Sequence, residues 1–277
     1  MFINSGVLAR FMCSATRVIK KISTGWMYGA TSVDDKMFVL LPQDSNQIAV
    51  YSTNDYQLLH PLNLTGLKTN SCNDITSCVR HQCLYMSDSD NRCIHYTYLA
   101  GGATSKWAVP GDPRGLSVTP VGGNLLVTCQ SPNKLVELSA DSGQCVREIA
   151  LQSNIEQPWH GVQLTTGQYV VCHGLDDSLH RVCIVDGGGR VTRSYGGRCG
   201  PDVGQLNWPC HLAVDEDSQF IFVADRNNHR VVMLSPTLEF VRYISEGLSK
   251  PRQLYLHHTT RRLCVCQLGG DVVVIQL

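Results

Sequence analysis

Residues 204–231 read GQLNWPCHLAVDEDSQFIFVADRNNHRV and contain candidate β-strands separated by polar turns. The first candidate strand opens at Pro209, and proline suits the start of a strand because no ladder donor is lost there. The second is the apolar run from Ile221 to Ala224, which ends at the polar segment Asp225 to His229. Asp and Asn in such a segment are typical of a tight turn. The stretch therefore predicts consecutive antiparallel strands.

The same pattern of an apolar strand, a polar turn and a second apolar strand occurs six times along the chain. The first strands of the six pairs are Met37 to Leu41, Cys83 to Met86, Leu125 to Cys129, Tyr169 to Cys172, Ile221 to Ala224 and Leu263 to Cys266. A shorter strand that opens with proline precedes four of them, at Pro113, Pro158, Pro209 and Pro251. A repeat of roughly forty to fifty residues built from short strands is typical of propeller blades.

A fourth strand follows the pairs most clearly at Val146 to Ile149 and Val241 to Ile244. The sixth unit has only three strands, but Ile19 to Ile22 near the N-terminus has the same apolar-polar-polar-apolar form. We expect this segment to complete the last blade, because closing the ring removes exposed sheet edges. The sequence thus predicts an all-β, six-bladed β-propeller at 17–277, after an N-terminal extension at 1–16.

These residues resemble a known repeat family. Gly204 to Asp215 together with Ile221 to Val231 look like an almost complete NHL repeat, whereas the other units are more degenerate or match mainly in spacing. NHL propellers often form the C-terminal part of tripartite-motif (TRIM) ubiquitin ligases, where they select the substrate. The resemblance implies a non-catalytic protein-interaction platform. Ligase activity does not carry over, because the sequence contains no RING, B-box or coiled-coil segment.

The charge balance and the cysteines of the sequence indicate which partners and which cellular compartment to expect. The chain has 23 basic and 23 acidic residues, so no global charge attracts it to nucleic acid or membranes. No apolar run reaches the roughly 18 residues that span a bilayer. The 13 cysteines are odd in number, and several, such as Cys129 and Cys264, lie in apolar runs. They indicate buried free thiols in a reducing compartment, and we expect a cytoplasmic protein without structural zinc.

The loops between second and third strands, and those between blades, emerge on one face of such a propeller, which we call the top face. The candidate binding residues on it are Asp74, Arg92, Arg114, Lys134, Trp159, His160, Arg181, His211, Arg226, Arg252 and Gln253. Trp and Arg dominate binding energy where an interface buries them. We therefore expect this face of a monomeric propeller to bind a protein partner, without a metal or another cofactor.

Four residues of the best repeat have a simpler interpretation. Asp225, Asn228, His229 and Arg230 follow a buried strand at a spacing that lets side chains hydrogen-bond to backbone across a tight turn. Such bonds stabilise turns without any ligand. We expect these four residues to be structural.

Two other functions remain open for the top face. Some NHL propellers bind single-stranded RNA there, with basic side chains on phosphates and planar ones on bases. Against this, the same loops carry Asp44, Asp88, Asp90, Asp112, Asp176, Asp177 and Asp271. The similarity of NHL blades to the peptide-amidating lyase implies a metal-dependent enzyme, with His160 and His211 in equivalent positions of neighbouring blades. A catalytic zinc usually takes three protein ligands, and the sequence places only these two histidines there.

Overall fold

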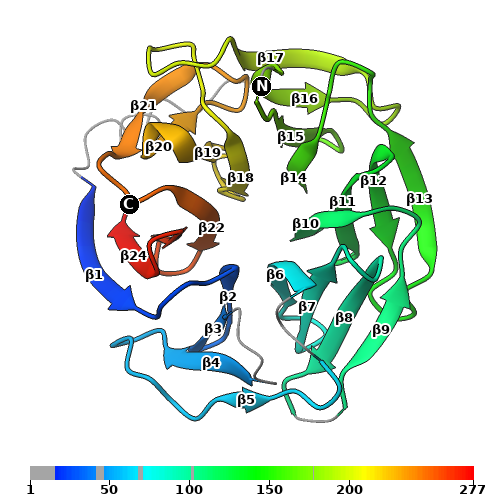
Figure 1. Cartoon of the computed structure of the whole chain (residues 1–277), viewed down its shortest axis with the longest axis vertical. Helices are drawn as coiled ribbons and strands as arrows, with labels where there is room; N and C mark the ends of the chain where they lie inside the picture. Colours follow the sequence, from blue (N-terminus) through cyan, green and yellow to red (C-terminus); the bar gives the residue numbers. More distant parts are fainter. Residues whose placement is uncertain (1–15, 42–46, 68–70, 101–102, 177) are drawn as a thin grey trace.

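The fold is that of a computed structural model, which describes residues 16–41, 47–67, 71–100, 103–176 and 178–277. The described residues form six four-stranded antiparallel sheets arranged as a ring (Figure 1). The predicted six-bladed β-propeller is therefore confirmed. Of the predicted N-terminal extension at 1–16, all but Thr16 lies outside the described residues.

Three blades form the first half of the ring. Blade 1 contains β2 (Gly29–Val33), β3 (Lys36–Leu40), β4 (Gln47–Ser52) and β5 (Leu62–Asn63). Blade 2 contains β6 (Cys72–Cys78), β7 (Cys83–Asp88), β8 (Cys93–Tyr98) and β9 (Ser105–Ala108). Blade 3 contains β10 (Pro113–Val118), β11 (Leu125–Gln130), β12 (Asn133–Leu138) and β13 (Cys145–Ala150).

The other three blades complete the circle. Blade 4 contains β14 (Pro158–Gln163), β15 (Tyr169–His173), β16 (His180–Val185) and β17 (Val191–Gly197). Blade 5 contains β18 (Pro209–Val214), β19 (Ile221–Asp225), β20 (Arg230–Leu234) and β21 (Phe240–Ser245), with the short 3-10 helix η2 (Arg226–Asn228) after β19. Blade 6 contains β22 (Pro251–His257), β23 (Arg262–Gln267), β24 (Asp271–Gln276) and β1 (Arg17–Ser23).

The N-terminal strand closes the ring, as the sequence predicts. β1 pairs antiparallel with β24, and Ile22 lies opposite Val272. The Ile22 side chain is buried in a cluster that also contains Met27, which lies between β1 and β2, and Met37 of the first blade. The closing strand thus supplies a core contact between the last blade and the first.

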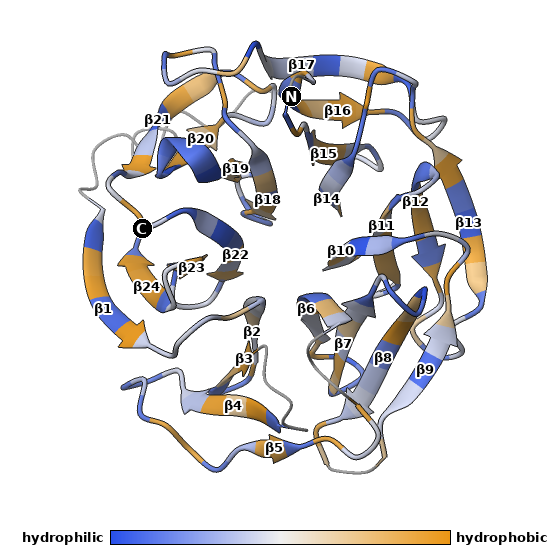
Figure 2. Cartoon of the chain, in the orientation of Figure 1, coloured by the Kyte–Doolittle hydropathy of each residue, from blue (hydrophilic) through white to orange (hydrophobic). Residues whose placement is uncertain are grey.

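The core lies between neighbouring blades, in apolar layers that run around the ring (Figure 2). The second strands are buried along nearly their whole length, as in β15 and β19. Strands covered on both faces have continuous apolar sequences, which is why these strands stand out in the sequence. The outermost strands are mostly exposed, as in β13. No helix in the described part of the chain has the length and hydropathy to cross a bilayer.

Five of the six innermost strands share a β-bulge near their first residue. The register shifts by one residue there, which leaves Asn73, Arg114, Trp159, Cys210 and Arg252 as the extra residues. A bulge redirects the side chain of its extra residue. Four of these strands open with proline, which is tolerated at bulges because no ladder donor is needed. The bulges thus bring five side chains from different blades to the same end of the central channel.

Candidate binding site on the top face

A cavity of about 270 Å³ lies at the end of the channel where the innermost strands begin. Its lining includes all five bulged side chains and residues from every blade. The lining residues are Tyr28, Asn73, Asp74, Arg114, Gly115, Trp159, Trp208, Cys210, His211, Arg226, Arg252 and Gln253. Seven of the residues that the sequence predicts for the top face line this cavity: Asp74, Arg114, Trp159, His211, Arg226, Arg252 and Gln253.

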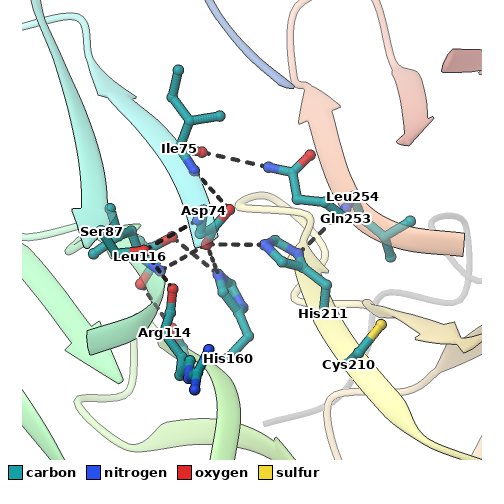
Figure 3. Close-up of polar contacts among 12 residues, drawn as sticks. Asp74, Ile75, Ser87, Arg114, Leu116, His160, Cys210, His211, Gln253 and Leu254 are labelled. Atoms are coloured by element: carbon teal, nitrogen blue, oxygen red, sulfur yellow. Dashed lines mark hydrogen bonds and ion pairs between the residues drawn. The ribbon is translucent and has the colours of Figure 1, made fainter. Parts of the chain in front are cut away.

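The floor of the cavity is a buried hydrogen-bonded group around Asp74 (Figure 3). The Asp74 carboxylate accepts the N–H of Ile75 at 2.9 Å and the N–H of Leu116 at 2.8 Å. His211 Nε2 lies 3.4 Å and His160 Nε2 3.9 Å from Asp74 Oδ2. The two imidazole rings stack with centroids 3.6 Å apart.

Hydrogen bonds fix the tautomers of the two histidines. His211 Nδ1 accepts the Leu254 N–H at 3.3 Å, so its Nε2 carries the proton and faces Asp74. His160 Nε2 lies 3.0 Å from the Leu116 carbonyl and donates to it. Burial and the neighbouring His211 lower the pKa of His160 to about 3, so this ring is neutral at pH 7.

Asp74 remains a carboxylate at neutral pH. Burial by itself raises the pKa of Asp74, but the His211 and His160 rings and the Leu116 N–H together hold it below its ordinary value. The cavity floor therefore combines one fixed negative charge with a neutral His160. Beside it, Gln253 bonds both backbone groups of Ala30, at 3.0 and 2.9 Å, and so joins blade 6 to blade 1.

Three guanidinium groups lie above this floor. Arg226 stacks over Trp208 with its central carbon 4.0 Å from the ring centroid, and Arg252 lies 4.9 Å from that of Tyr28. In such cation–π contacts the guanidinium is attracted to the face of the ring. Arg114 donates to the Asn73 side-chain oxygen at 2.8 Å. Burial lowers the pKa of Arg252, and the charge of Arg226 acts in the same direction, which indicates that the two cations are close.

Four other predicted residues do not line this cavity. Arg92 is exposed and pairs with Asp112 at 2.9 Å, and Lys134 pairs with Glu148 at 2.8 Å. Arg181 donates to the Asn154 carbonyl at 2.7 Å. His160 lies below the cavity and lines a separate hollow that opens toward the opposite face.

Three of the four predicted turn residues, Asp225, Asn228 and Arg230, share one hydrogen-bonded network in blade 5. The buried Asp225 carboxylate accepts the Asn207 N–H, the Asn228 amide and the Arg230 Nε, at 2.7 to 2.8 Å. Arg230 also donates to two loop carbonyls and lies over the Tyr243 ring. His229 takes a left-handed conformation after η2, and its Nδ1 donates to the Leu248 carbonyl at 2.8 Å. These contacts connect the turn after β19 to the loops that precede and follow blade 5.

Two groups in the described part of the chain have the composition of metal ligands. They are Asp74 with His160 and His211, and Asp88 with Cys93 and His95, each with its ligand atoms within 4.8 Å of one another. In the second group Asp88 accepts from Asn91 and His95, and it occupies the register position of Asp225. That group is thus the turn network of blade 2, in which Cys93 occupies the register position of Arg230 and His95, two residues further on, bonds the carboxylate.

The predicted set lacks five of the lining residues: Tyr28, Asn73, Gly115, Trp208 and Cys210. Asn73 could have been found from the sequence, because it stands directly before Asp74 as Arg252 stands directly before Gln253. Trp208 directly precedes the strand-opening Pro209, whereas the residues before the other strand-opening prolines are Asp112, Gln157 and Lys250. Tyr28 precedes β2, which has no bulge and gives no such signal.

Comparison with known proteins gives the fold alone. No protein-family model matches the sequence, and no curated protein matches it significantly. The structure is similar to the β-propeller domain of Cps50 (Swd1) from Myceliophteria thermophila, with TM-score 0.67 and 12% identity over 95% of this chain and 99% of that one. It is also similar to virginiamycin B lyase from Staphylococcus aureus, with TM-score 0.65 and 10% identity over 95% and 99% of the two chains. Hydrazine synthase from Kuenenia stuttgartiensis gives TM-score 0.65 and 14% identity over 94% and 97%. At identities of 10 to 14% these comparisons show a shared β-propeller fold and nothing further.

Proposed function

We propose that this chain is a non-catalytic protein-interaction platform that holds its partner at the top-face cavity. The observation that carries the proposal is the convergence of three arginines and two tryptophans from four blades on one cavity. Trp and Arg are the residue types most enriched among binding hot spots. A hollow lined by them holds a protruding side chain of a partner, and the surrounding loops complete the interface.

The polar groups on the cavity floor support a binding role over a catalytic one. Asp74 and His160 are each engaged by the backbone of neighbouring strands. A general base must reach a substrate proton, whereas these atoms join blades 2, 3 and 4 at the channel. Because His160 is neutral and buried, we assign it a packing role in the channel rather than a role in proton transfer.

The resemblance of residues 204–231 to an NHL repeat suggests the kind of assembly. In the proposal the propeller is the substrate-recognition module of a TRIM-type ubiquitin ligase and acts as a monomer in the cytoplasm. The twelve described cysteines are all free thiols, and such thiols persist in a reducing compartment.

A metal-dependent enzyme is the second candidate, and one observation favours it. Asp74, His160 and His211 offer three ligand atoms within 4.8 Å of one another, and a structural neighbour is a lyase. Three arginines on the same cavity oppose it, because their charges repel a cation at short range. Elemental analysis separates the candidates: the platform proposal expects no stoichiometric metal, and one tightly held zinc per chain would favour the enzyme.

Affinity capture from cell lysate tests the platform. The variant combines Arg114→Ala, Trp159→Ala and Arg252→Ala, and the control combines Arg92→Ala and Arg181→Ala on the same face outside the cavity. Each central anchor typically contributes about 2 kcal/mol or more, or roughly thirtyfold in affinity. We expect the cavity variant to lose its partner and the control to keep it, with similar melting temperatures. If the folded cavity variant retains every partner, the proposed site is refuted. If the captured partner is RNA and its binding is lost with added salt, the partner is a nucleic acid rather than a protein.

A further inference from the structure

The charges around the cavity do not balance. Arg114, Arg226 and Arg252 each carry a full positive charge, while the single acidic side chain of the lining is Asp74. Counted without the histidines, the three guanidiniums and one carboxylate leave a net charge of about +2. Two of the cations are partly buried close to each other, which costs free energy unless an anion lies between them.

The lining also has more hydrogen-bond donors than acceptors. The side chains of Arg226 and Arg252 make no hydrogen bond or ion pair to any residue that the structure describes. Four donor nitrogens of the lining are buried without a described hydrogen-bond partner: Nε of Arg114 and Arg226, and the indole nitrogens of Trp159 and Trp208. Arg and Trp side chains can only donate. A ligand that satisfies them, after small side-chain rotations, must therefore be rich in acceptors.

The size and surroundings of the cavity limit the ligand further. A volume of about 270 Å³ is slightly below the range of roughly 300–1,000 Å³ typical of drug-sized ligands. It suits one anionic side chain rather than a nucleotide. Two of the guanidiniums lie over the Trp208 and Tyr28 rings, and the planar fork of an arginine matches the oxygens of a phosphate.

The three other basic residues predicted for the top face do not extend this positive charge into a track. Arg92 pairs with Asp112, Lys134 pairs with Glu148, and Arg181 is bonded to a loop carbonyl. A nucleic acid would need a basic groove that follows its backbone. Arg114, Arg226 and Arg252 instead line one cavity, and Arg92, Lys134 and Arg181 lie outside it.

We propose that the top-face cavity binds the phosphorylated side chain of a serine or threonine in a partner protein, with Arg114, Arg226 and Arg252 around the phosphate. A phosphomonoester carries about −1.5 to −2 charges at pH 7 and three strong acceptor oxygens. It therefore matches both the charge and the donor excess of the lining, whereas a single carboxylate leaves a positive charge unmatched. This inference rests on the proposed function, because it names the group by which a partner protein is recognised.

The test is fluorescence polarisation with a degenerate phosphoserine and phosphothreonine peptide library and its unphosphorylated twin. We expect measurable binding only for the phosphorylated library, with competition by inorganic phosphate. Because a charge-assisted hydrogen bond is lost, Arg226→Gln and Arg252→Gln should each weaken binding at least about tenfold. Arg226→Lys keeps the charge but loses the planar fork, so intermediate binding is expected. Arg92→Gln, an exposed arginine on the same face, is the control and should bind like wild type.

Equal binding of the two libraries, or binding that Arg226→Gln and Arg252→Gln leave unchanged, would overturn the inference. So would tighter binding of a homopolymer RNA at the same salt concentration. Affinity capture with and without phosphatase treatment of the lysate separates this inference from the platform itself. If a partner requires the cavity residues but is still captured after phosphatase treatment, the platform proposal stands and recognition of a phosphate group is refuted. If phosphatase treatment abolishes capture of the partner, both the platform proposal and phosphate recognition are supported.

Discussion

The substitution Ile22→Ala tests whether the N-terminal strand holds the ring closed. The Ile22 side chain is only 7% exposed and packs between the last blade and the first. The change removes three carbon atoms, which at about 0.8 kcal/mol for each buried methylene corresponds to roughly 2.4 kcal/mol. A cavity left behind adds to this value. For a chain of this size the melting temperature should fall by about 5–10 °C.

Val18→Ala is the matched control, because Val18 lies on the same strand and is 52% exposed. Exposed substitutions usually change stability by less than about 0.5 kcal/mol, so the shift should stay below about 2 °C. Differential scanning calorimetry of both variants beside wild type gives the comparison. Equal shifts for the two substitutions would mean that Ile22 is not a core contact, and the reasoning about closure would fail.

Three further predictions concern the blade network, the channel and pH. Arg230→Ala should cost about 3–5 kcal/mol in urea denaturation, because it leaves the buried Asp225 carboxylate without its cation; a loss below about 1 kcal/mol would contradict this. Gly115→Ala should destabilise by about 1–3 kcal/mol, since its Cβ would lie 2.5 Å from the Trp159 carbonyl oxygen; an unchanged midpoint would show that β10 and β14 are not so close. Because the folded-state pKa of His160 is lowered from 6.5 to about 3, the unfolded state binds the extra proton, and stability should fall as pH decreases from about 6.5 to 3, by up to about 1.4 kcal/mol per pH unit. His160→Gln should flatten that slope, and an equal slope in both proteins would refute a neutral buried His160.

The sequence was sufficient for the blade pattern because second strands are apolar on both faces. Ile221 to Ala224 and Leu263 to Cys266 lie within β19 and β23, as expected. The closing strand was also predictable, because Ile19 and Ile22 match the spacing of other fourth strands. The bulges were not predicted: a single extra residue leaves no signal in an alternating pattern, and only the register reveals it.

The site was harder to predict because a residue on a top-face loop lines the cavity only if its side chain lies near the central channel. Arg92 and Arg226 both follow a second strand, but only Arg226 lines the cavity, where it stacks on Trp208. The acids expected to offset the basic charge illustrate the same limit. Asp112 and Asp271 form ion pairs away from the cavity, whereas Asp44 and Asp177 lie outside the described residues.

The most direct test of the central claim is site-specific photo-cross-linking in cells, with the photoreactive residue in place of Asn73 in one protein and of His258 in another. Asn73 lines the top-face cavity, and His258 lines the hollow on the opposite face. The platform account predicts a partner protein cross-linked from position 73 and not from position 258. A partner cross-linked only from position 258, or equally from both positions, would contradict it.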